Sequence, residues 1–180
     1  GRRPAPPAGA THRAAGPALL RDCVARFPDG LATGDAGWTT GGDLPARWVI
    51  HTVGPNHAAG ERDRSLLESC YRRALEVADE LGARHLAFPL ISAGVYGWPR
   101  ADAISAAVET IAQTPTRVEH VRLVAFTEDV MRQIRAQVFR VQPPASRPGT
   151  IGSLFDRGVT QWGLRGDPYL WRELRAQFAQ

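Results

Sequence analysis

The 180-residue sequence contains no lysine, and all 22 of its basic residues are arginine. The arginines outnumber the 18 acidic residues and give a formal net charge of +4. A guanidinium group is a forked hydrogen-bond donor that suits phosphate. Because the arginines are scattered along the chain rather than clustered, codon bias explains them more simply. A nucleic-acid partner is therefore not required.

Cysteines and long apolar runs are equally scarce. Cys23 and Cys70 lie in separate predicted helices and form no Cys-x-x-Cys pair, so the sequence predicts neither a zinc site nor a redox pair. We expect both to be buried thiols of a reducing compartment. No apolar run approaches the roughly 20 residues of a membrane-spanning helix, and the start lacks the hydrophobic region of a signal peptide. These absences favour a cytoplasmic protein without a membrane partner.

The five histidines show no metal-ligand spacing with a cysteine or carboxylate cluster, so the sequence indicates no metal. It also contains neither a Gly-x-Gly-x-x-Gly fingerprint nor a Walker loop, which argues against the nucleotide-binding families that use them.

Strand and helix patterns alternate through the middle of the chain. Apolar, β-branched runs predict strands near 36–40 and over 47–53, 85–90 and 118–126. Apolar residues at helical spacing predict helices over 11–26, 65–81, 99–111 and 128–139. Gly16-Pro17 interrupts the first helix, and Ser65 with Glu68 are expected to form a capping box on the second. This alternation favours an α/β fold with a mostly parallel sheet and helices on both faces.

The two ends of the chain differ from this middle part. Residues 1–10 consist only of Gly, Arg, Pro and Ala and are predicted to be disordered. Residues 140–150 have the composition of a linker. In the tail 151–180, Asp167 and Pro168 begin an amphipathic helix. Since one such helix cannot fold alone, we expect it to pack on the domain formed by residues 11–139.

The most informative stretch is FPLISAGVYGWP, from Phe88 to Pro99. In an open α/β sheet, ligands bind beyond the carboxyl ends of the strands, which is where this loop lies. Glycines let the backbone approach a ligand, and successive N–H groups beside a helix start bind anions. Ser92 adds a hydroxyl and Tyr96 a flat wall for a sugar. The loop fits a phosphate or diphosphate beside a ribose, and a simple turn at a strand end is the alternative.

This loop resembles the second ligand loop of macro domains, the modules that bind ADP-ribose. The resemblance extends in colinear order over roughly residues 9–139. It includes HRAAGPALLRDC from His12, ARWVIHTVGP from Ala46 to Pro55, and the helix LLESCYRRALEVADELG. The first of these is similar to the branch that contains O-acetyl-ADP-ribose deacetylases and mono-ADP-ribosyl hydrolases. The resemblance implies a three-layer α/β/α fold with a mixed sheet.

The resemblance also implies a role for two regions. The loop would wrap the diphosphate and the distal ribose, and the end of the last strand would lie near the adenine. The residues concerned are Ser92, Ala93, Gly94, Val95, Tyr96 and Gly97 in the loop, and Phe126 after the strand. His51 has no role in the family's chemistry, and we expect it to be a hydrogen-bonded structural residue.

The sequence departs from the family before His12. Macro domains begin with two strands, an acidic residue that recognises the adenine, and an Asn-Ala-Ala-Asn segment. None of these is present here. The position of the catalytic aspartate is Ala8, which cannot accept a proton, and prolines replace the glycines of the first ligand loop. We therefore expect an N-terminally truncated domain that lacks the first strands, with His12 as the remaining candidate catalytic group.

Two functions remain open at this point. The family resemblance implies a hydrolase that cleaves O-acetyl-ADP-ribose or removes mono-ADP-ribose from proteins. Ala8 and the altered first loop favour instead a catalytically inactive ADP-ribose reader, or a remnant that does not bind. In either case we expect a monomer without a cofactor, whose partner is ADP-ribose, a derivative of it, or an ADP-ribosylated protein.

Overall fold

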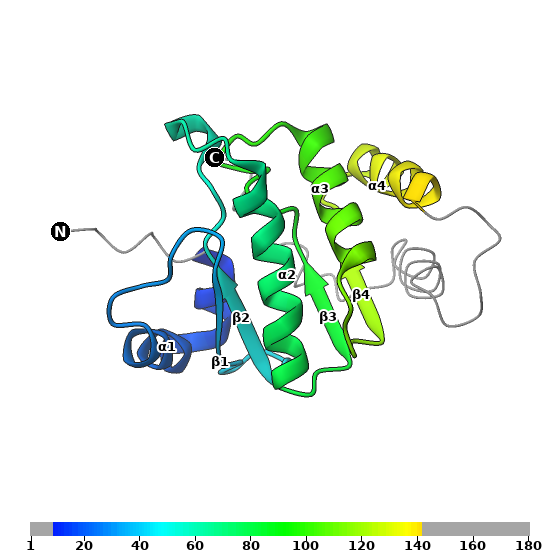
Figure 1. Ribbon diagram of the computed structural model, residues 1–180. Helices are drawn as coiled ribbons and strands as arrows, with labels where there is room; N and C mark the ends of the chain where they lie inside the picture. The colour runs from blue at the N-terminus through cyan, green and yellow to red at the C-terminus, as the bar shows by residue number, and fades with distance from the viewer. Residues whose placement is uncertain (1–8, 142–180) are drawn as a thin grey trace.

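The computed structural model describes residues 9–141 (Figure 1). Helices and strands alternate along this range, as the sequence predicts. The elements are α1 (Gly9–Arg26), β1 (Ala36–Thr40), β2 (Trp48–Thr52), the 3-10 turn η1 (His57–Ala59), α2 (Arg64–Glu80), β3 (His85–Phe88), α3 (Arg100–Gln113), β4 (His120–Leu123) and α4 (Glu128–Val141). Ala8 lies outside the described residues, as do nearly all of the expected linker and the tail 151–180.

The strands form two pairs. β1 and β2 are antiparallel, with Ala36 opposite Thr52, whereas β3 and β4 are parallel, with His85 opposite His120. Within residues 9–141 no ladder joins β2 to β3. The expectation of a mostly parallel sheet is therefore wrong for the first pair. The connection between β1 and β2 spans only residues 41–47, which is long enough for a hairpin but too short for the crossover that parallel strands require.

The core lies where α2 and α3 cover the strands (Figure 1). One face of α2 is buried at helical spacing, and alternate residues of β3 and β4 point toward it. The main contributors are Leu67, Cys70, Tyr71, Ala74, Leu75, Ala78, Phe88, Ala103, Ala107, Ile111 and Val121. A second apolar cluster, Ile104 and Val108 with Val130 and Ile134, joins α3 to α4. Burial raises the pKa of the Cys70 thiol, as expected for an inert cysteine, whereas Cys23 is only half-buried.

Local details of three helices follow from single residues. The helix α1 is broken at Gly16, which has a φ of 71° that a glycine adopts without strain, so the predicted interruption is confirmed. The capping box predicted for α2 is wrong, because Asp63 caps this helix and accepts a hydrogen bond of 2.9 Å from the Ser65 amide. Pro99 is the N-cap of α3 rather than its first helical residue.

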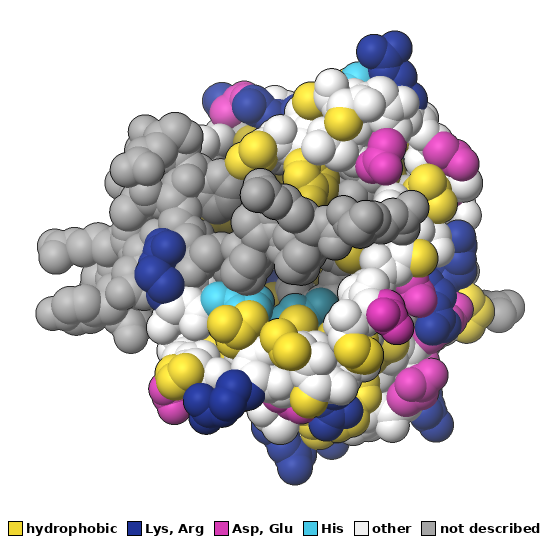
Figure 2. Space-filling view, turned by 90° about the vertical axis from the view of Figure 1, so that its left-hand side faces the viewer, with side chains coloured by type: hydrophobic (Ala, Val, Ile, Leu, Met, Phe, Trp, Pro, Cys, Tyr) yellow, Lys and Arg dark blue, Asp and Glu magenta, His cyan; other side chains and the backbone are white. Residues whose placement is uncertain are grey.

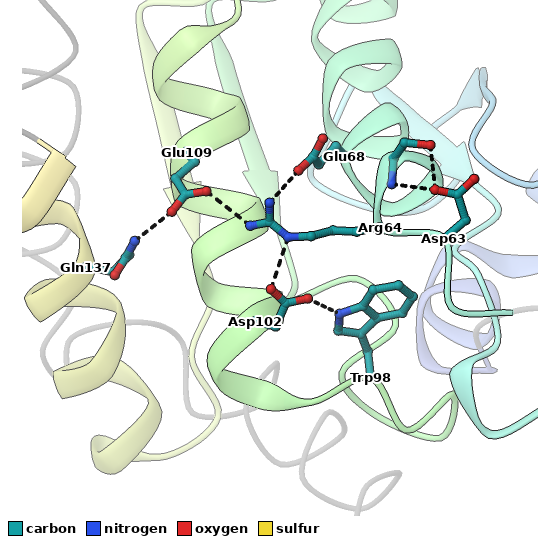
Figure 3. A network of polar contacts seen from close by, with 8 residues as sticks. Asp63, Arg64, Glu68, Trp98, Asp102, Glu109 and Gln137 are labelled. Carbon is teal, nitrogen blue, oxygen red and sulfur yellow. Dashed lines mark hydrogen bonds and ion pairs between the residues drawn. The ribbon is translucent and has the colours of Figure 1, made fainter. Parts of the chain in front are cut away.

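Arg64 connects the helices at one end of the core (Figure 3). Its guanidinium group donates to Glu68 in α2 at 2.7 Å and to Glu109 in α3 at 3.1 Å, and its Nε forms an ion pair with Asp102 at 3.0 Å. Asp102 in turn accepts a hydrogen bond of 2.8 Å from the indole of Trp98. The side chains of Arg64, Asp102 and Glu109 are more than a third exposed and that of Glu68 is 30% exposed, so the ion pairs add little stability individually. Their effect is to fix the position of Trp98 relative to α2 and α3.

Candidate functional site

Two loops meet beyond the carboxyl ends of β2 and β3. The β2–α2 loop spans residues 53–63, and the β3–α3 loop spans residues 89–99. The Ala58 amide donates a hydrogen bond of 3.0 Å to the carbonyl oxygen of Tyr96. The ring of His57 packs edge-on against Trp98, with ring centroids 5.3 Å apart. The two loops therefore form one continuous surface at this edge.

Gly54 allows this close approach. A Cβ atom at this position would collide with Ser92 Oγ and would lie 2.7 Å from Ile91 Cγ2. Since real Cβ contacts are not this short, any side chain at position 54 would push the two loops apart.

The β3–α3 loop folds back on itself and leaves three successive amides free. The Gly97 amide donates to the carbonyl of Gly94, and the Trp98 amide to the carbonyl of Ser92, both at 2.9 Å. The N–H groups of Gly94, Val95 and Tyr96 have no acceptor among the described residues. They precede Arg100, the first residue of α3, by four to six positions, in the loop that leads into the helix N-terminus. Consecutive free amides at such a position can bind an anion without a charged side chain.

Ser92 shows a second sign of a binding loop. Among the described residues it is the only non-glycine with a positive φ, at 60°. Its hydroxyl oxygen is buried, and no described residue forms a hydrogen bond with it. A strained backbone and an unpaired buried hydroxyl are costly for a structural turn, and such features gather at ligand sites. These features favour a binding loop over the simple turn that the sequence left as the alternative.

Tyr71 holds the beginning of the loop. This α2 residue is fully buried, and its hydroxyl accepts a hydrogen bond of 2.9 Å from the Ile91 amide. Burial raises the pKa of the phenol, so Tyr71 stays neutral. Its ring also packs edge-on against Phe88, the last residue of β3, with centroids 5.3 Å apart. Tyr71 and Phe88 thus fix the point where the strand becomes the loop.

Phe126 lies at the same edge of the β3–β4 pair. The Val124 amide donates to the carbonyl of Phe88 at 2.8 Å, which extends the pairing one residue beyond β4. Phe126 follows two residues later and is half-buried. Its position is therefore compatible with the role that the family resemblance implies.

His12 lies on α1, beside the β1–β2 hairpin. Its ring centroid is 6.0 Å from that of His51 in β2, and its Nδ1 atom is buried without a described hydrogen-bond partner. Figure 2 shows histidine side chains in a hollow between apolar side chains on the face that includes α1. No hydrogen bond or ring contact within residues 9–141 joins His12 to the β3–α3 loop.

His51 is a structural residue, as expected. It shares a hydrogen bond of 2.8 Å with the hydroxyl of Thr39 in β1, and Phe27 packs edge-on against its ring. Burial lowers the pKa of His51 to about 4, with a further contribution from His12, whose own pKa is lowered by burial. Both imidazoles are therefore neutral at pH 7.

The sequence did not identify the β2–α2 loop as part of the site. The strand predicted over 47–53 ends directly before Gly54-Pro55, and the rule that places FPLISAGVYGWP at the binding edge applies equally to the carboxyl end of β2. Tyr71 was also missed as a loop anchor, because its helical spacing predicts only a core position.

Residues 9–141 contain neither a metal-binding cluster nor a membrane-spanning helix. No group of three or more histidine, cysteine or acidic side chains is arranged to hold a metal ion. No helix in this range is long and apolar enough to cross a membrane.

Comparison with known proteins identifies similar chains. The family model described as "Macro domain" matches residues 7–107. A macro domain-containing protein of Streptomyces nogalater is 57% identical over 122 residues, which are 66% of this chain and 67% of that protein. An O-acetyl-ADP-ribose deacetylase of Salmonella typhimurium is 47% identical over 130 residues, 69% of this chain and 73% of that protein.

Solved structures agree with the sequence matches. The Oceanobacillus iheyensis macrodomain with ADP superposes with a TM-score of 0.69 at 35% identity, over 74% of both chains. The Trypanosoma brucei macrodomain in complex with ADP-ribose gives a TM-score of 0.63 at 39% identity, over 72% of this chain and 55% of that one. The predicted α/β/α fold with mixed strand pairing is thereby confirmed.

Replacing Tyr71 with phenylalanine removes the acceptor of the Ile91 amide and leaves a buried N–H unpaired. We expect a loss of about 1–3 kcal/mol in the free energy of unfolding, measured by urea denaturation, together with faster hydrogen exchange at the Ile91 amide. Tyr96→Phe is the matched control, since no described residue forms a hydrogen bond with its hydroxyl. Equal stability and equal exchange in the two variants would show that the Tyr71 hydroxyl does not anchor the loop.

Acid should destabilise the protein through His51. In the unfolded chain this side chain binds a proton as the pH falls below about 6.5, whereas the folded protein resists protonation until about pH 4. The contribution of His51 is therefore complete above pH 6.5 and lost between pH 6.5 and 4, at no more than about 1.4 kcal/mol per pH unit. Urea denaturation of the wild type and of His51→Gln across this range should give a smaller loss in the variant. Parallel pH profiles would refute this assignment.

Proposed function

The chain belongs to the macro domain family, and we propose that it binds ADP-ribose where the β2–α2 and β3–α3 loops meet. The observation that carries this proposal is the set of three free amides at Gly94, Val95 and Tyr96, beside the strained Ser92. A loop with these properties presents donors to an anion and offers no acidic side chain to repel one. The diphosphate is the anionic part of ADP-ribose.

The remaining groups at this edge suit the other parts of the ligand. Tyr96 is half-buried and offers an amphipathic ring against which a ribose can lie, and Gly97 leaves space beside it. Phe126, at the end of β4, offers an aromatic face for the adenine. Structures of similar chains contain ADP or ADP-ribose, which supports this choice of ligand. An ADP-ribosyl group on a protein would present the same chemistry and is a further proposed partner.

Hydrolysis is the second candidate function. Several relatives, including those of Salmonella typhimurium and Escherichia fergusonii, are named O-acetyl-ADP-ribose deacetylase. Water would attack the acetyl carbonyl, break the ester bond, and release acetate and ADP-ribose. This step needs a general base, and alanine at position 8 cannot act as one. His12 is neutral at pH 7 and could accept a proton, but its ring contact is with His51. These observations favour a reader of ADP-ribose over an enzyme.

The wider organisation is also proposed. We infer a cytoplasmic monomer built on the domain 11–139; the tail 151–180 lies outside the described residues. In the described part of the chain the four exposed large apolar side chains are on three different segments, which supports the monomeric state. They are Leu20, Val24, Val95 and Phe139.

Gly94→Glu tests the binding proposal. The new carboxylate would lie among the free amides and repel the diphosphate, so affinity for ADP-ribose should fall at least about tenfold. Isothermal titration calorimetry of the whole chain should give a dissociation constant of micromolar order for the wild type. Gln113→Glu adds the same charge at the other end of α3 and should bind like the wild type. A folded wild type that binds no ADP-ribose, or two variants equally weakened, would refute the proposal.

Incubation with O-acetyl-ADP-ribose separates the two candidate functions. Acetate release is followed by proton NMR, with the wild type and His12→Ala at equal concentrations. A reader should release acetate no faster than buffer does, and the variant should behave identically. Multiple turnovers by the wild type that disappear in His12→Ala would instead establish the chain as a hydrolase with His12 in its catalytic machinery.

A further inference from the structure

Two histidines face each other at the start of the parallel strands, away from the proposed ligand site. His85 begins β3 and His120 begins β4, and the register places them directly opposite one another. Their ring centroids are 4.9 Å apart. The loops proposed to bind ADP-ribose lie at the other, carboxyl ends of these strands. The pair is thus separate from the site described above.

The alternation of the strands places both rings on the face opposite the core. Phe88 in β3 and Val121 in β4 are buried, while His85 is exposed and His120 half-buried. No described residue forms a hydrogen bond or an ion pair with either imidazole. A metal ion can therefore bind the ring nitrogens without breaking a hydrogen bond to any described residue.

The spacing of the rings matches two ligands on one metal ion. A zinc ion lies about 2.0 Å from each coordinating nitrogen, and that nitrogen about 1.1 Å from its ring centroid, so the metal lies about 3.1 Å from each centroid. Two centroids 4.9 Å apart then subtend about 104° at the metal. This angle is close to the tetrahedral value of about 109° that zinc adopts in proteins. Adjacent strands already hold the rings at this separation.

We propose that His85 and His120 form a two-imidazole chelate for Zn²⁺. Neutral imidazole is a preferred zinc ligand, and the two rings supply half of a tetrahedral shell, with water in the other positions. Glu119 is adjacent, but its carboxylate accepts a hydrogen bond of 2.7 Å from the Arg84 guanidinium, which holds its pKa below the usual range. Glu119 is therefore not counted as a ligand. Bound zinc would join β3 to β4 and stabilise the parallel pair in the folded state only.

The sequence could not reveal this pair. The two histidines are 35 positions apart, and neither lies near a cysteine or a carboxylate cluster with metal-ligand spacing. Only the parallel register brings them together. The expectation that no metal binds was drawn from spacing along the chain, which carries no information about register.

The test is a calorimetric titration of Zn²⁺ into the untagged, metal-free whole chain at pH 7.5. We expect one ion per chain, with affinity at least about tenfold weaker in His85→Asn and in His120→Asn. His57→Asn and His12→Asn make the same replacement outside the pair and should bind like the wild type. Zinc should also raise the melting temperature of the wild type but not of the double variant, which reports binding without any activity assay.

Two results would overturn the proposal. One is the absence of heat and of any melting shift in the wild type at millimolar zinc. The other is zinc binding that persists unchanged when both His85 and His120 are replaced, which would assign the ion to other residues. Circular dichroism of each variant establishes that it is folded, and neither result bears on ADP-ribose binding at the opposite end of the strands.

Discussion

The candidate site depends on the buried hydrogen bond between the Ile91 amide and the Tyr71 hydroxyl. This bond fixes the residue at which β3 becomes a loop, and it does so from inside the core, where Tyr71 is held by the packing of α2. The other end of the loop is fixed by Trp98, whose indole donates to Asp102, which is itself paired with Arg64. Between these two anchors the backbone has little freedom, because Gly54 of the neighbouring loop lies directly against Ser92.

This restraint explains why the loop can keep costly features. A positive φ and an unpaired buried hydroxyl at Ser92 would be unfavourable in a loop that could relax. Because both ends are held, the amides stay available for an anion without reorganisation on binding. The rigid core thus accounts for the properties that make the loop a candidate for recognition of a diphosphate.

The sequence predicted the alternation of strands and helices, the family and this loop, since each depends on residues that are close together in the chain. It predicted less where distant segments meet. The β1–β2 hairpin was interpreted as part of a mostly parallel sheet, although its short connection is visible in the sequence. The cap on α2 is Asp63 rather than Ser65, which is already the second residue of the helix, and the side chain of Glu68 is paired with Arg64. Three further features depend on tertiary packing or strand register. They are the contact of Gly54 with Ser92, the anchoring of the loop by Tyr71, and the pairing of His85 with His120.

The most direct test of the account is to follow the backbone amides of the ¹⁵N-labelled chain by NMR while ADP-ribose is added. If these three amides bind the diphosphate, the amide signals of Gly94, Val95 and Tyr96 shift saturably, and by more than those of any other described residue. The Ile91 amide, already bonded to Tyr71, should shift less than these three. Saturable shifts confined to α1 and the β1–β2 hairpin, with the three loop amides unchanged, would contradict binding at the loop. The ligand would then bind near His12 and His51.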